Sequence, residues 1–477
     1  MIIANTYKGQ TIAVFGLGRT GITAAKSLTK GGATVLAWDD MQASRDAAKA
    51  AGIALTDLTS SDWSKIDALV LSPGIPHHKP KPHWTAERAR EHDIQIICDI
   101  EIFAREIAAR APERRPKIIA ITGTNGKSTT TSLIGHILNT CGRDAQIGGN
   151  IGRGVLDLDD MHRGTHYVLE LSSYQLERTF SLRANSAVFI NLTPDHIERH
   201  GDMAGYRAAK MRIFDNQQAK DIAVVGVDDE NGQHLATELI AKNGRRIIPI
   251  SGSRALGRGV SVINGKLYAS IDRKSVEICD LRDAQALDGQ HNWQNAAAAF
   301  AAVQGLGLDP KAVGKAILSF GGLAHRMERI GKVVNVAYVN DSKATNAEAA
   351  RQALRAYDDI FWIAGGVAKE GGIVPLATEL SAVRKAYLIG EAAPSFHRVL
   401  KKQNVSHKMS GDIHRAILCA TRDALASGAK NPVVLLSPAC ASFDQYKNFE
   451  VRGDAFRKEA RAIIDMFEAE KAKGRAA

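Results

Sequence analysis

The chain has 477 residues, a length that suggests about three domains. Its composition, 45% hydrophobic and 24% charged, is that of an ordinary globular protein, and no apolar run approaches the ~20 residues that span a bilayer. The net charge of +11 favours anionic small molecules over nucleic acid, because the Lys and Arg residues form no long run and do not alternate with aromatic residues.

The cysteines are scattered, odd in number and without a Cys-x-x-Cys pair, so we expect reduced thiols and no disulfide or zinc framework. The N-terminus passes from Lys8 almost directly into a glycine-rich strand, which does not resemble a signal peptide. We therefore expect a cytoplasmic protein without membrane insertion.

Strand and helix patterns alternate nearly throughout, which predicts an α/β fold of parallel units. The alternation breaks at 110–116 and again at Gly321-Gly322. These breaks predict three consecutive α/β domains, at 1–112, 113–322 and 323–477.

The first predicted domain opens with a strand at Thr11–Phe15, followed by Gly16-Leu-Gly-Arg-Thr-Gly21 and a helix. A second strand, from Ala33 to Trp38, ends at Asp39 and Asp40. This is the Gly-x-Gly-x-x-Gly pattern of a Rossmann-like domain, which alone would indicate NAD or FAD. The two aspartates could equally form a solvated turn.

Loops also follow other predicted strands of this domain. A strand at 68–71 ends in Ser72-Pro-Gly74, and open α/β sheets bind ligands at the carboxyl ends of their strands. Ser72 and Gly74 are therefore candidates for ligand contact.

The second domain opens with a phosphate loop. The apolar run 118–121 leads into Thr-Gly-Thr-Asn-Gly-Lys-Ser-Thr (122–129) and then a helical pattern. Backbone N–H groups at a helix N-terminus attract phosphate, a lysine neutralises it, and a hydroxyl can bind Mg²⁺. The spacing is shorter than the Walker pattern, which would place glycine at position 121. The alternative is a glycine turn that only caps a helix.

Polar residues at neighbouring strand ends extend this site. The strand at 165–170 ends in Glu170, and the strand that begins at Ala187 leads to Asp195 and His196. The carboxyl ends of parallel strands share one edge, so Lys127, Ser128, Glu170 and His196 should converge into a nucleotide–Mg²⁺ site. Each of these residues taken singly could be an ordinary polar residue.

Two further segments have more than one interpretation. The pattern of residues 206–214 predicts a helix on which Lys210 faces water. Asn292 and Asn295, spaced i, i+3 at the start of an alanine-rich helix, share a face and suit adenine recognition, but N-capping by Asn292 explains the pattern equally well.

The third domain has predicted strands at 333–339, 360–364, 386–389 and 433–436, each followed by a polar segment. These segments, with the preceding His325-Arg326, can present Arg326, Lys343, Lys369 and several hydroxyls to a ligand.

Taken together, the motifs resemble those of the ATP-dependent Mur ligases of peptidoglycan synthesis over essentially the whole chain. They are Gly-Thr-Asn-Gly-Lys-Ser-Thr (123–129), Glu-Leu-Ser-Ser-Tyr-Gln-Leu-Glu (170–177), His-Asn-x-x-Asn (291–295), His-Arg (325–326) and Asn-Asp-Ser-Lys-Ala-Thr-Asn (340–346). Residues 437–449 are similar to those of the D-glutamate-adding members, and the Asp-Asn-Pro-Arg motif of the diamino-acid-adding members is absent.

This resemblance implies a Rossmann-like first domain that binds UDP and not NAD, a P-loop-type central ATPase domain and a Rossmann-like C-terminal domain that binds the amino acid. It implies UDP-N-acetylmuramoyl-L-alanine and D-glutamate as substrates, with ATP and two Mg²⁺ ions, and an acyl-phosphate intermediate whose breakdown releases phosphate, with ADP as the other product. We expect a monomer.

The resemblance also implies roles for residues of the central domain. Ser128 and Glu170 would hold one Mg²⁺, and His196 and Lys210 the second, with Lys210 carbamylated by CO₂. The catalytic set would be Lys127, Glu170, His196 and Lys210. The ATP contacts would be Gly123, Thr124, Asn125, Gly126, Lys127, Ser128 and Thr129, with Asn295, Arg326 and Asp341 near adenine, phosphate and ribose.

For the other substrates, the resemblance places Arg19 and Thr20 along the UDP phosphates. Asp39 and Asp40 would lie near uridine, with Ser72 and Gly74 beside them and Asn150 near the muramoyl end. The D-glutamate contacts would be Lys343, Thr345, Lys369, Ser442, Phe443 and Phe449.

Two positions depart from the family pattern. Lys369 lacks a neighbouring aspartate, and Asp40 stands where relatives can carry a hydroxyl. Three alternatives remain open. A sister ligase would add L-alanine or a diamino acid, and a folylpolyglutamate-type ligase should lack the block 16–21. A non-enzymatic nucleotide-binding protein would tolerate loss of His196 or Lys210.

Overall fold

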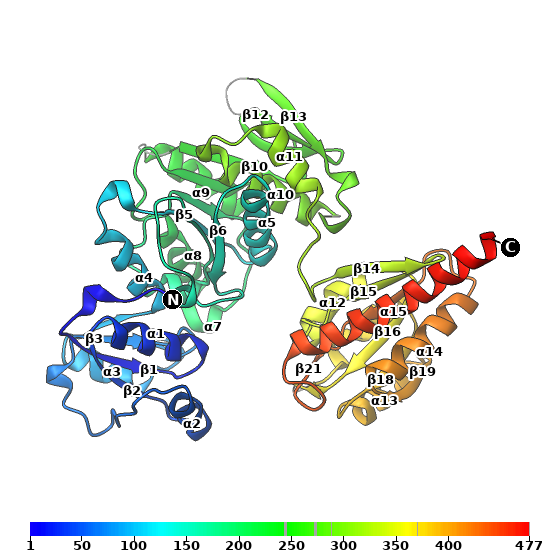
Figure 1. Cartoon of the computed structure of the whole chain (residues 1–477), viewed down its shortest axis with the longest axis horizontal. Coiled ribbons are helices and arrows are strands. Elements are labelled where there is room, and N and C mark those ends of the chain that lie inside the picture. The colour runs from blue at the N-terminus through cyan, green and yellow to red at the C-terminus, as the bar shows by residue number, and fades with distance from the viewer. Residues whose placement is uncertain (243–245, 271–273, 288, 370, 477) are drawn as a thin grey trace. The chain divides into compact units, whose positions relative to one another are not determined.

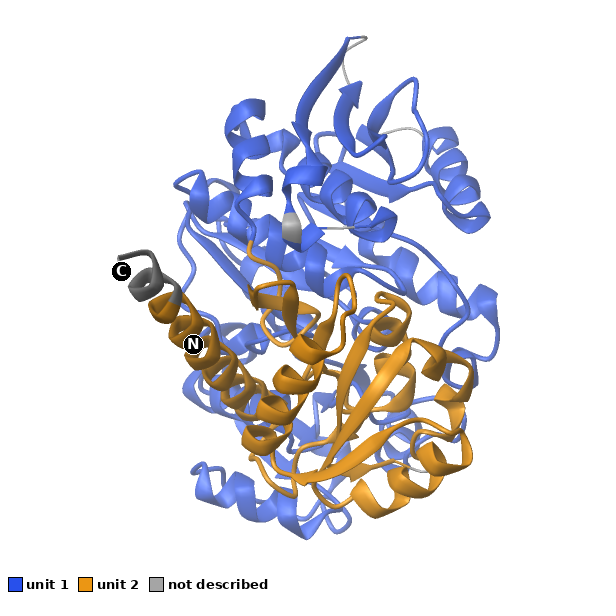
Figure 2. Cartoon of the chain, turned by 90° about the vertical axis from the view of Figure 1, so that its right-hand side faces the viewer, with its two compact units in different colours: residues 1–320 blue, residues 321–477 orange. Residues whose placement is uncertain are grey.

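The computed structural model describes residues 1–242, 246–270, 274–287, 289–369 and 371–476. The chain divides into two compact units, residues 1–320 and 321–477 (Figure 2). The predicted α/β class is confirmed, because the larger sheets are mainly parallel and follow one another along the chain (Figure 1). The boundaries after residues 112 and 322 stay predictions. Within the described residues, no helix is both long and apolar enough to cross a bilayer.

The first sheet is parallel, with strand order β2-β1-β3-β4. The predicted strands at 11–15 and 68–71 are confirmed as β1 and β3, because both are short apolar runs that the sheet buries. The strands are β1 (Thr11–Phe15), β2 (Thr34–Trp38), β3 (Ala68–Leu71) and β4 (Gln95–Ile97). The helices are α1 (Arg19–Lys30), α2 (Gln42–Ala50), α3 (Trp84–Glu91) and α4 (Asp99–Ala108).

Two glycines allow α1 to begin directly against the sheet. Gly16 has a φ of +92°, and a Cβ there would lie 2.5 Å from the Cβ of Ser72. A Cβ on Gly21 would lie 2.0 Å from the carbonyl oxygen of Gly16. The glycine pattern therefore serves the close approach of the turn, the helix and the β3 exit.

The second sheet has nine strands in the described residues, in the order β13-β12-β11-β10-β9-β8-β5-β7-β6. Its strands are β5 (Lys117–Thr122), β6 (Ala145–Gly149), β7 (His166–Glu170), β8 (Ser186–Phe189), β9 (Ile222–Gly226), β10 (Arg246–Ser251), β11 (Gly259–Ile263), β12 (Lys266–Ser270) and β13 (Ser275–Asp280). The expectation of parallel strands is wrong at one edge, where β11, β12 and β13 pair antiparallel.

Helices cover both faces of this sheet (Figure 1). Ile119 and Ile121 of β5 pack into a cluster with α5 and α10, whereas Ile118 and Ala120 pack into a different one. That second cluster also contains Ile12 of β1, which explains why the first two sheets form one unit. The helices are α5 (Lys127–Thr140), α6 (Ser173–Leu176), α7 (Ile197–His200), α8 (Met203–Met211), α9 (Glu230–Ala241), α10 (Gln290–Ala302) and α11 (Pro310–Leu318).

The third sheet lies in the second unit, with strand order β14-β15-β20-β16-β18-β19. The prediction of one strand at 333–339 is wrong, because a turn after Val333 separates two antiparallel strands. The strands are β14 (Glu328–Val333), β15 (Val336–Asn340), β16 (Ile360–Gly365), β18 (Val383–Ile389), β19 (His407–Gly411) and β20 (Val433–Leu436), with a separate short pair β17 (Val367–Ala368) and β21 (Cys440–Ala441). The helices are α12 (Ala347–Arg355), α13 (Ala393–Lys402), α14 (Ile413–Ala426) and α15 (Phe449–Ala476).

Asp99, at the start of α4, is a buried acid whose removal should change how stability depends on pH. It is 4% exposed, and burial raises the pKa of its carboxyl to about 6. The carboxyl of Asp99 therefore loses its proton at a lower pH in the unfolded chain than in the folded one. As the pH rises from about 4 to about 6, Asp99 consequently lowers the free energy of unfolding. Relative to the wild type, Asp99→Asn should gain about 2 kcal/mol of unfolding free energy between about pH 4 and pH 7. Denaturant titrations of both proteins at each pH measure this difference, and a constant difference would refute the expectation.

Candidate active site

The phosphate loop leads from β5 into α5, which begins at Lys127. The N-cap residue is Gly126, with a left-handed φ of +82°, and no side chain caps the helix. The N–H groups of the first helical turn therefore have no side-chain acceptor at the N-cap, which suits an anion.

The loop meets the adenine candidate of α10. A Cβ on Gly126 would lie 2.2 Å from Oδ1 of Asn295, and the positive φ at this position disfavours any other residue as well. Asn295 accepts a hydrogen bond from Thr130 Oγ1 at 3.2 Å and donates one to Asn292 Oδ1 at 3.2 Å. The N-cap of α10 is Gly289, so the N-capping explanation for Asn292 is wrong.

Two lysines meet behind the loop. Lys127 Nζ donates to the carbonyl oxygens of Gly123 at 3.0 Å and Thr124 at 2.7 Å, and Lys210 Nζ donates to the same Gly123 oxygen at 2.8 Å. Lys210 is only 2% exposed, so the prediction that it faces water is wrong. Burial, with the charge of Lys127, lowers the pKa of Lys210 to about 7.

Glu170 supplies a carboxylate at the end of β7, the strand beside β5. The side chain is 3% exposed, and its Oε1 accepts a hydrogen bond from Asn150 Nδ2 at 2.9 Å. Its Oε2 is buried and has no hydrogen-bond partner among the described residues. A buried carboxylate oxygen without a donor is costly, and a hard cation such as Mg²⁺ would satisfy it. Ser128, buried in the first turn of α5, adds a hydroxyl of the kind that Mg²⁺ accepts.

His196 lies in the segment between β8 and α7, with a left-handed φ of +53°. Its Nδ1 pairs with the Tyr174 hydroxyl at 3.0 Å, and its Nε2 lies 3.4 Å from Oδ2 of Asp195. The described residues contain no group of three or more His, Cys, Asp or Glu arranged to hold a metal. The candidate ligands are instead mixed, since the set includes a hydroxyl and an amine.

The first sheet carries the nucleotide-sugar candidates. Asp39 accepts hydrogen bonds from the backbone N–H groups of Leu17 at 2.7 Å and Met41 at 2.8 Å, so it shapes the glycine turn. Asp40 accepts from Trp84 Nε1 at 3.3 Å and pairs with His83 Nε2 at 3.0 Å. Arg19 and Thr20 begin α1, which also lacks a side-chain cap, and Ser72 and Gly74 follow β3.

The second unit holds a buried network after β15. Asp341 is 5% exposed and accepts hydrogen bonds from Ser437 Oγ at 2.8 Å and from the Met327 N–H at 3.2 Å. Burial raises the pKa of its carboxyl to about 7. Asn340 Nδ2 lies 3.1 Å from Nδ1 of His325, which orders the segment that carries Arg326.

The amino-acid candidates of this unit differ in exposure. Lys343 Nζ lies 5.8 Å from the centre of the Phe449 ring, so the structure brings these two together. Ser442 is buried, Thr345 and Arg326 are half-buried, and Lys369 and Phe443 are exposed.

Several residues around the candidate site were not anticipated from the sequence. Tyr174, His83 and Trp84 bond to predicted site residues, but none of them stands at a strand end. The nearest signal is that Tyr174 lies within the motif 170–177.

Known proteins are similar to this chain in sequence and in fold. Residues 121–303 match the family described as the Mur ligase middle domain. The UDP-N-acetylmuramoylalanine–D-glutamate ligase of Phenylobacterium zucineum is 54% identical, over 98% of this chain and 99% of that protein. The enzyme of that name from Caulobacter vibrioides is also 54% identical, over 96% of this chain and 97% of its own length.

Among solved structures, the UDP-N-acetylmuramate-alanine ligase MurC of Thermotoga maritima superposes with a TM-score of 0.54 at 19% identity, over 95% of this chain and 99% of that one. A UDP-N-acetylmuramoyl-L-alanyl-D-glutamate–2,6-diaminopimelate ligase gives a TM-score of 0.57 at 20% identity, over 98% and 94% of the two chains. These two structures show the fold alone, because their sequences are only 19% and 20% identical to this chain. The 54% identity to the two D-glutamate ligases extends over nearly the whole chain and shows the family as well. The chain belongs to the Mur ligase family.

Proposed function

We propose that this chain is an ATP-dependent ligase that adds D-glutamate to UDP-N-acetylmuramoyl-L-alanine in the cytoplasm, acting as a monomer. The observation that carries the proposal is the 54% identity over 98% of the chain to a ligase of that name. Three observations support the ATP-dependent part of the reaction: Gly126 as the N-cap of α5, the buried Lys210, and the Glu170 oxygen that has no hydrogen-bond partner among the described residues.

In this proposal the ATP phosphates bind over residues 123–129. The first N–H groups of α5 and the Lys127 ammonium neutralise phosphate charge, as in other phosphate loops. Ser128 and Glu170 would hold one Mg²⁺, which would neutralise charge on the transferred phosphoryl group. Asn295, Arg326 and Asp341 are proposed to contact adenine, phosphate and ribose.

Lys210 and His196 are proposed to hold a second Mg²⁺. A carbamate formed with CO₂ would turn the Lys210 amine into an oxygen ligand, which a hard cation prefers. Carbamylation needs a neutral amine, and the lowered pKa of Lys210, about 7, provides one near neutral pH.

The other substrates are assigned to both units. Arg19, Thr20, Asp39, Asp40, Ser72, Gly74 and Asn150 are proposed for the nucleotide sugar. Lys343, Thr345, Lys369, Ser442, Phe443 and Phe449 are proposed for D-glutamate, with the lysines facing its carboxylates.

The reaction would proceed in two steps. The carboxylate of the nucleotide-sugar substrate attacks the γ-phosphorus of ATP, which gives an acyl phosphate and ADP. The D-glutamate amine then attacks the acyl carbon, and the tetrahedral intermediate loses phosphate and a proton to leave the amide. Lys127 would stabilise the charge that develops in the first step.

Phosphate release tests this function directly. With ATP, Mg²⁺ and UDP-N-acetylmuramoyl-L-alanine, we expect release that depends on D-glutamate and is not supported by L-glutamate, L-alanine or diaminopimelate assayed in parallel. Release with another of these amino acids would keep the ligase reaction and refute the specificity. No release with any of them would refute the proposed nucleotide-sugar substrate.

A further inference from the structure

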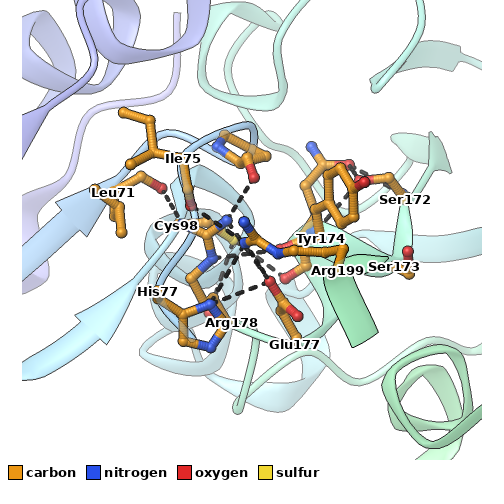
Figure 3. Close-up of polar contacts among 12 residues, drawn as sticks. Leu71, Ile75, His77, Cys98, Ser172, Ser173, Tyr174, Glu177, Arg178 and Arg199 are labelled. Atoms are coloured by element: carbon orange, nitrogen blue, oxygen red, sulfur yellow. Dashed lines mark hydrogen bonds and ion pairs between the residues drawn. The ribbon is translucent and has the colours of Figure 1, made fainter. Parts of the chain in front are cut away.

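A buried polar cluster joins the loop after β3 to the central sheet (Figure 3). We call residues 72–77 the β3 loop. Arg178, two residues after α6, is 1% exposed, and its guanidinium donates to three successive carbonyl oxygens. These are Leu71 at 3.0 Å, Ser72 at 3.2 Å and Pro73 at 2.7 Å. Arg178, in the segment that follows β7 of the second sheet, therefore fixes the backbone at the end of β3.

A second arginine holds the far end of the same loop. Arg199 of α7 donates to the Ile75 carbonyl oxygen at 3.2 Å and to Glu177 Oε1 at 2.7 Å (Figure 3). His77 also lies 3.2 Å from Glu177. The β3 loop is thus bonded at both ends to the segments that follow β7 and β8.

The same cluster also contacts His196, a candidate metal ligand, through Tyr174. The Arg199 guanidinium lies 4.8 Å from the centre of the Tyr174 ring, and the Tyr174 hydroxyl bonds to Nδ1 of His196. The β3 loop and His196 are consequently supported by the same group of side chains.

A structural role alone does not explain a buried charge at position 178. The nearest carboxylate contact of Arg178 is Glu177 Oε1, 3.9 Å from its Nη2, so carbonyl dipoles provide most of its compensation. Burial lowers the pKa of Arg178 to about 10, which reflects the cost of desolvating it. Apolar side chains often fill such sites with equal or greater stability.

The hydrogen bonds of Arg178 determine how the β3 loop presents its peptide groups. In a planar trans peptide the C=O and the N–H point in opposite directions. With the Pro73 carbonyl directed at Arg178, the N–H of Gly74 points away from it, and Gly74 is exposed. The side chains of Ser72 and Pro73 line a small, partly open cavity together with Thr20 and Gly21 of α1, so this part of the loop faces the start of that helix.

We propose that Arg178 is a positioning residue for the nucleotide sugar, which orients the Ser72–Gly74 backbone so that the Gly74 N–H meets the anionic ligand bound at the start of α1. This inference rests on the proposed function, because the ligand is its UDP substrate.

The test compares Arg178→Met with the wild type in steady-state kinetics. We expect the KM for UDP-N-acetylmuramoyl-L-alanine to rise about tenfold or more, with the KM values for ATP and D-glutamate within about twofold, because the lost hydrogen bonds act on one substrate's loop. Arg115→Met is the matched control, since Arg115 also donates to carbonyl oxygens, those of Ala108 and Arg110, away from the β3 loop. It should leave all three KM values unchanged.

Each other outcome has a defined meaning. An unchanged KM for the nucleotide sugar in folded Arg178→Met, or an equal rise in all three KM values, would overturn the proposal. If this variant does not fold, Arg178→Lys is compared in the same way, since one ammonium cannot reach three carbonyls. Failure of both variants to fold would assign Arg178 to stability and also overturn it. If the wild type shows no ligase activity, the proposed function fails, and calorimetric binding of UDP to the same proteins then decides the inference.

Discussion

Replacing Lys210 by alanine is expected to lower kcat by about 10²- to 10³-fold, because the variant loses the proposed ligand of the second Mg²⁺ and its charge stabilisation. A short carboxylic acid, or added bicarbonate, should partly restore turnover, since either can place a carboxylate-like oxygen donor in the space that the side chain leaves. Phosphate release with and without these additives is the measurement. Lys220→Ala, which removes an exposed lysine, is the control and should remain fully active. Near-normal turnover of Lys210→Ala would refute its role.

The pH dependence of the wild type provides a second measurement on Lys210. Its pKa of about 7 lies below the ordinary value of 10.5, so the neutral amine fraction rises as the pH passes through about 7. The proposed carbamate, and the activity that would depend on it, should therefore increase over the same interval at fixed dissolved CO₂. The free energy of unfolding should also rise between about pH 7 and pH 10.5. Over this range the unfolded chain keeps a proton on Lys210 that the folded chain has released. The cost of burying Lys210 is full below about pH 7 and disappears above about pH 10.5.

Lys127→Ala is expected to reduce kcat by about 10²- to 10³-fold, the range found when one donor to a developing charge is removed. The ammonium of Lys127 donates hydrogen bonds to the carbonyl oxygens of Gly123 and Thr124, both within the phosphate loop. Single-turnover formation of ADP from ATP and the nucleotide sugar would report the first chemical step. Both this rate and the steady-state rate should fall together.

The matched control for Lys127 is Lys117→Ala. Lys117 is an exposed lysine at the other end of β5, and its loss should leave both rates at the wild-type level. If Lys127→Ala formed ADP in a single turnover as fast as the wild type, the phosphate-charge role would be wrong.

Lys210 and Asn292 show where sequence patterns mislead. Helical periodicity treats a lysine between Ala209 and Met211 as solvent-facing, because it does not show that α8 packs against the phosphate loop. N-cap preference favours asparagine at the start of a helix, but here the chain enters α10 one turn earlier, at Gly289. In both cases tertiary contacts outweigh local preference.

The ends of several strands, by contrast, were predictable because they depend on local sequence. The apolar runs of β1, β3 and β20 are followed directly by Gly16, Ser72 and Ser437, so their carboxyl ends appear in the sequence. The hairpin of β14 and β15 was missed because Val333, Val334 and Val336 read as one apolar run interrupted only by Asn335. Arg178 could not be predicted as a loop contact, because its carbonyl partners lie more than a hundred residues earlier in the chain.

The close contact between Gly126 and Asn295 limits how this enzyme can diverge or be redesigned. A methyl group at position 126 would overlap the amide oxygen of Asn295, and the left-handed φ of +82° there disfavours any side chain as well. A smaller residue at position 295 would remove the overlap but not the backbone requirement. A library that varies the phosphate loop should therefore hold glycine at 126 and place its diversity at other positions.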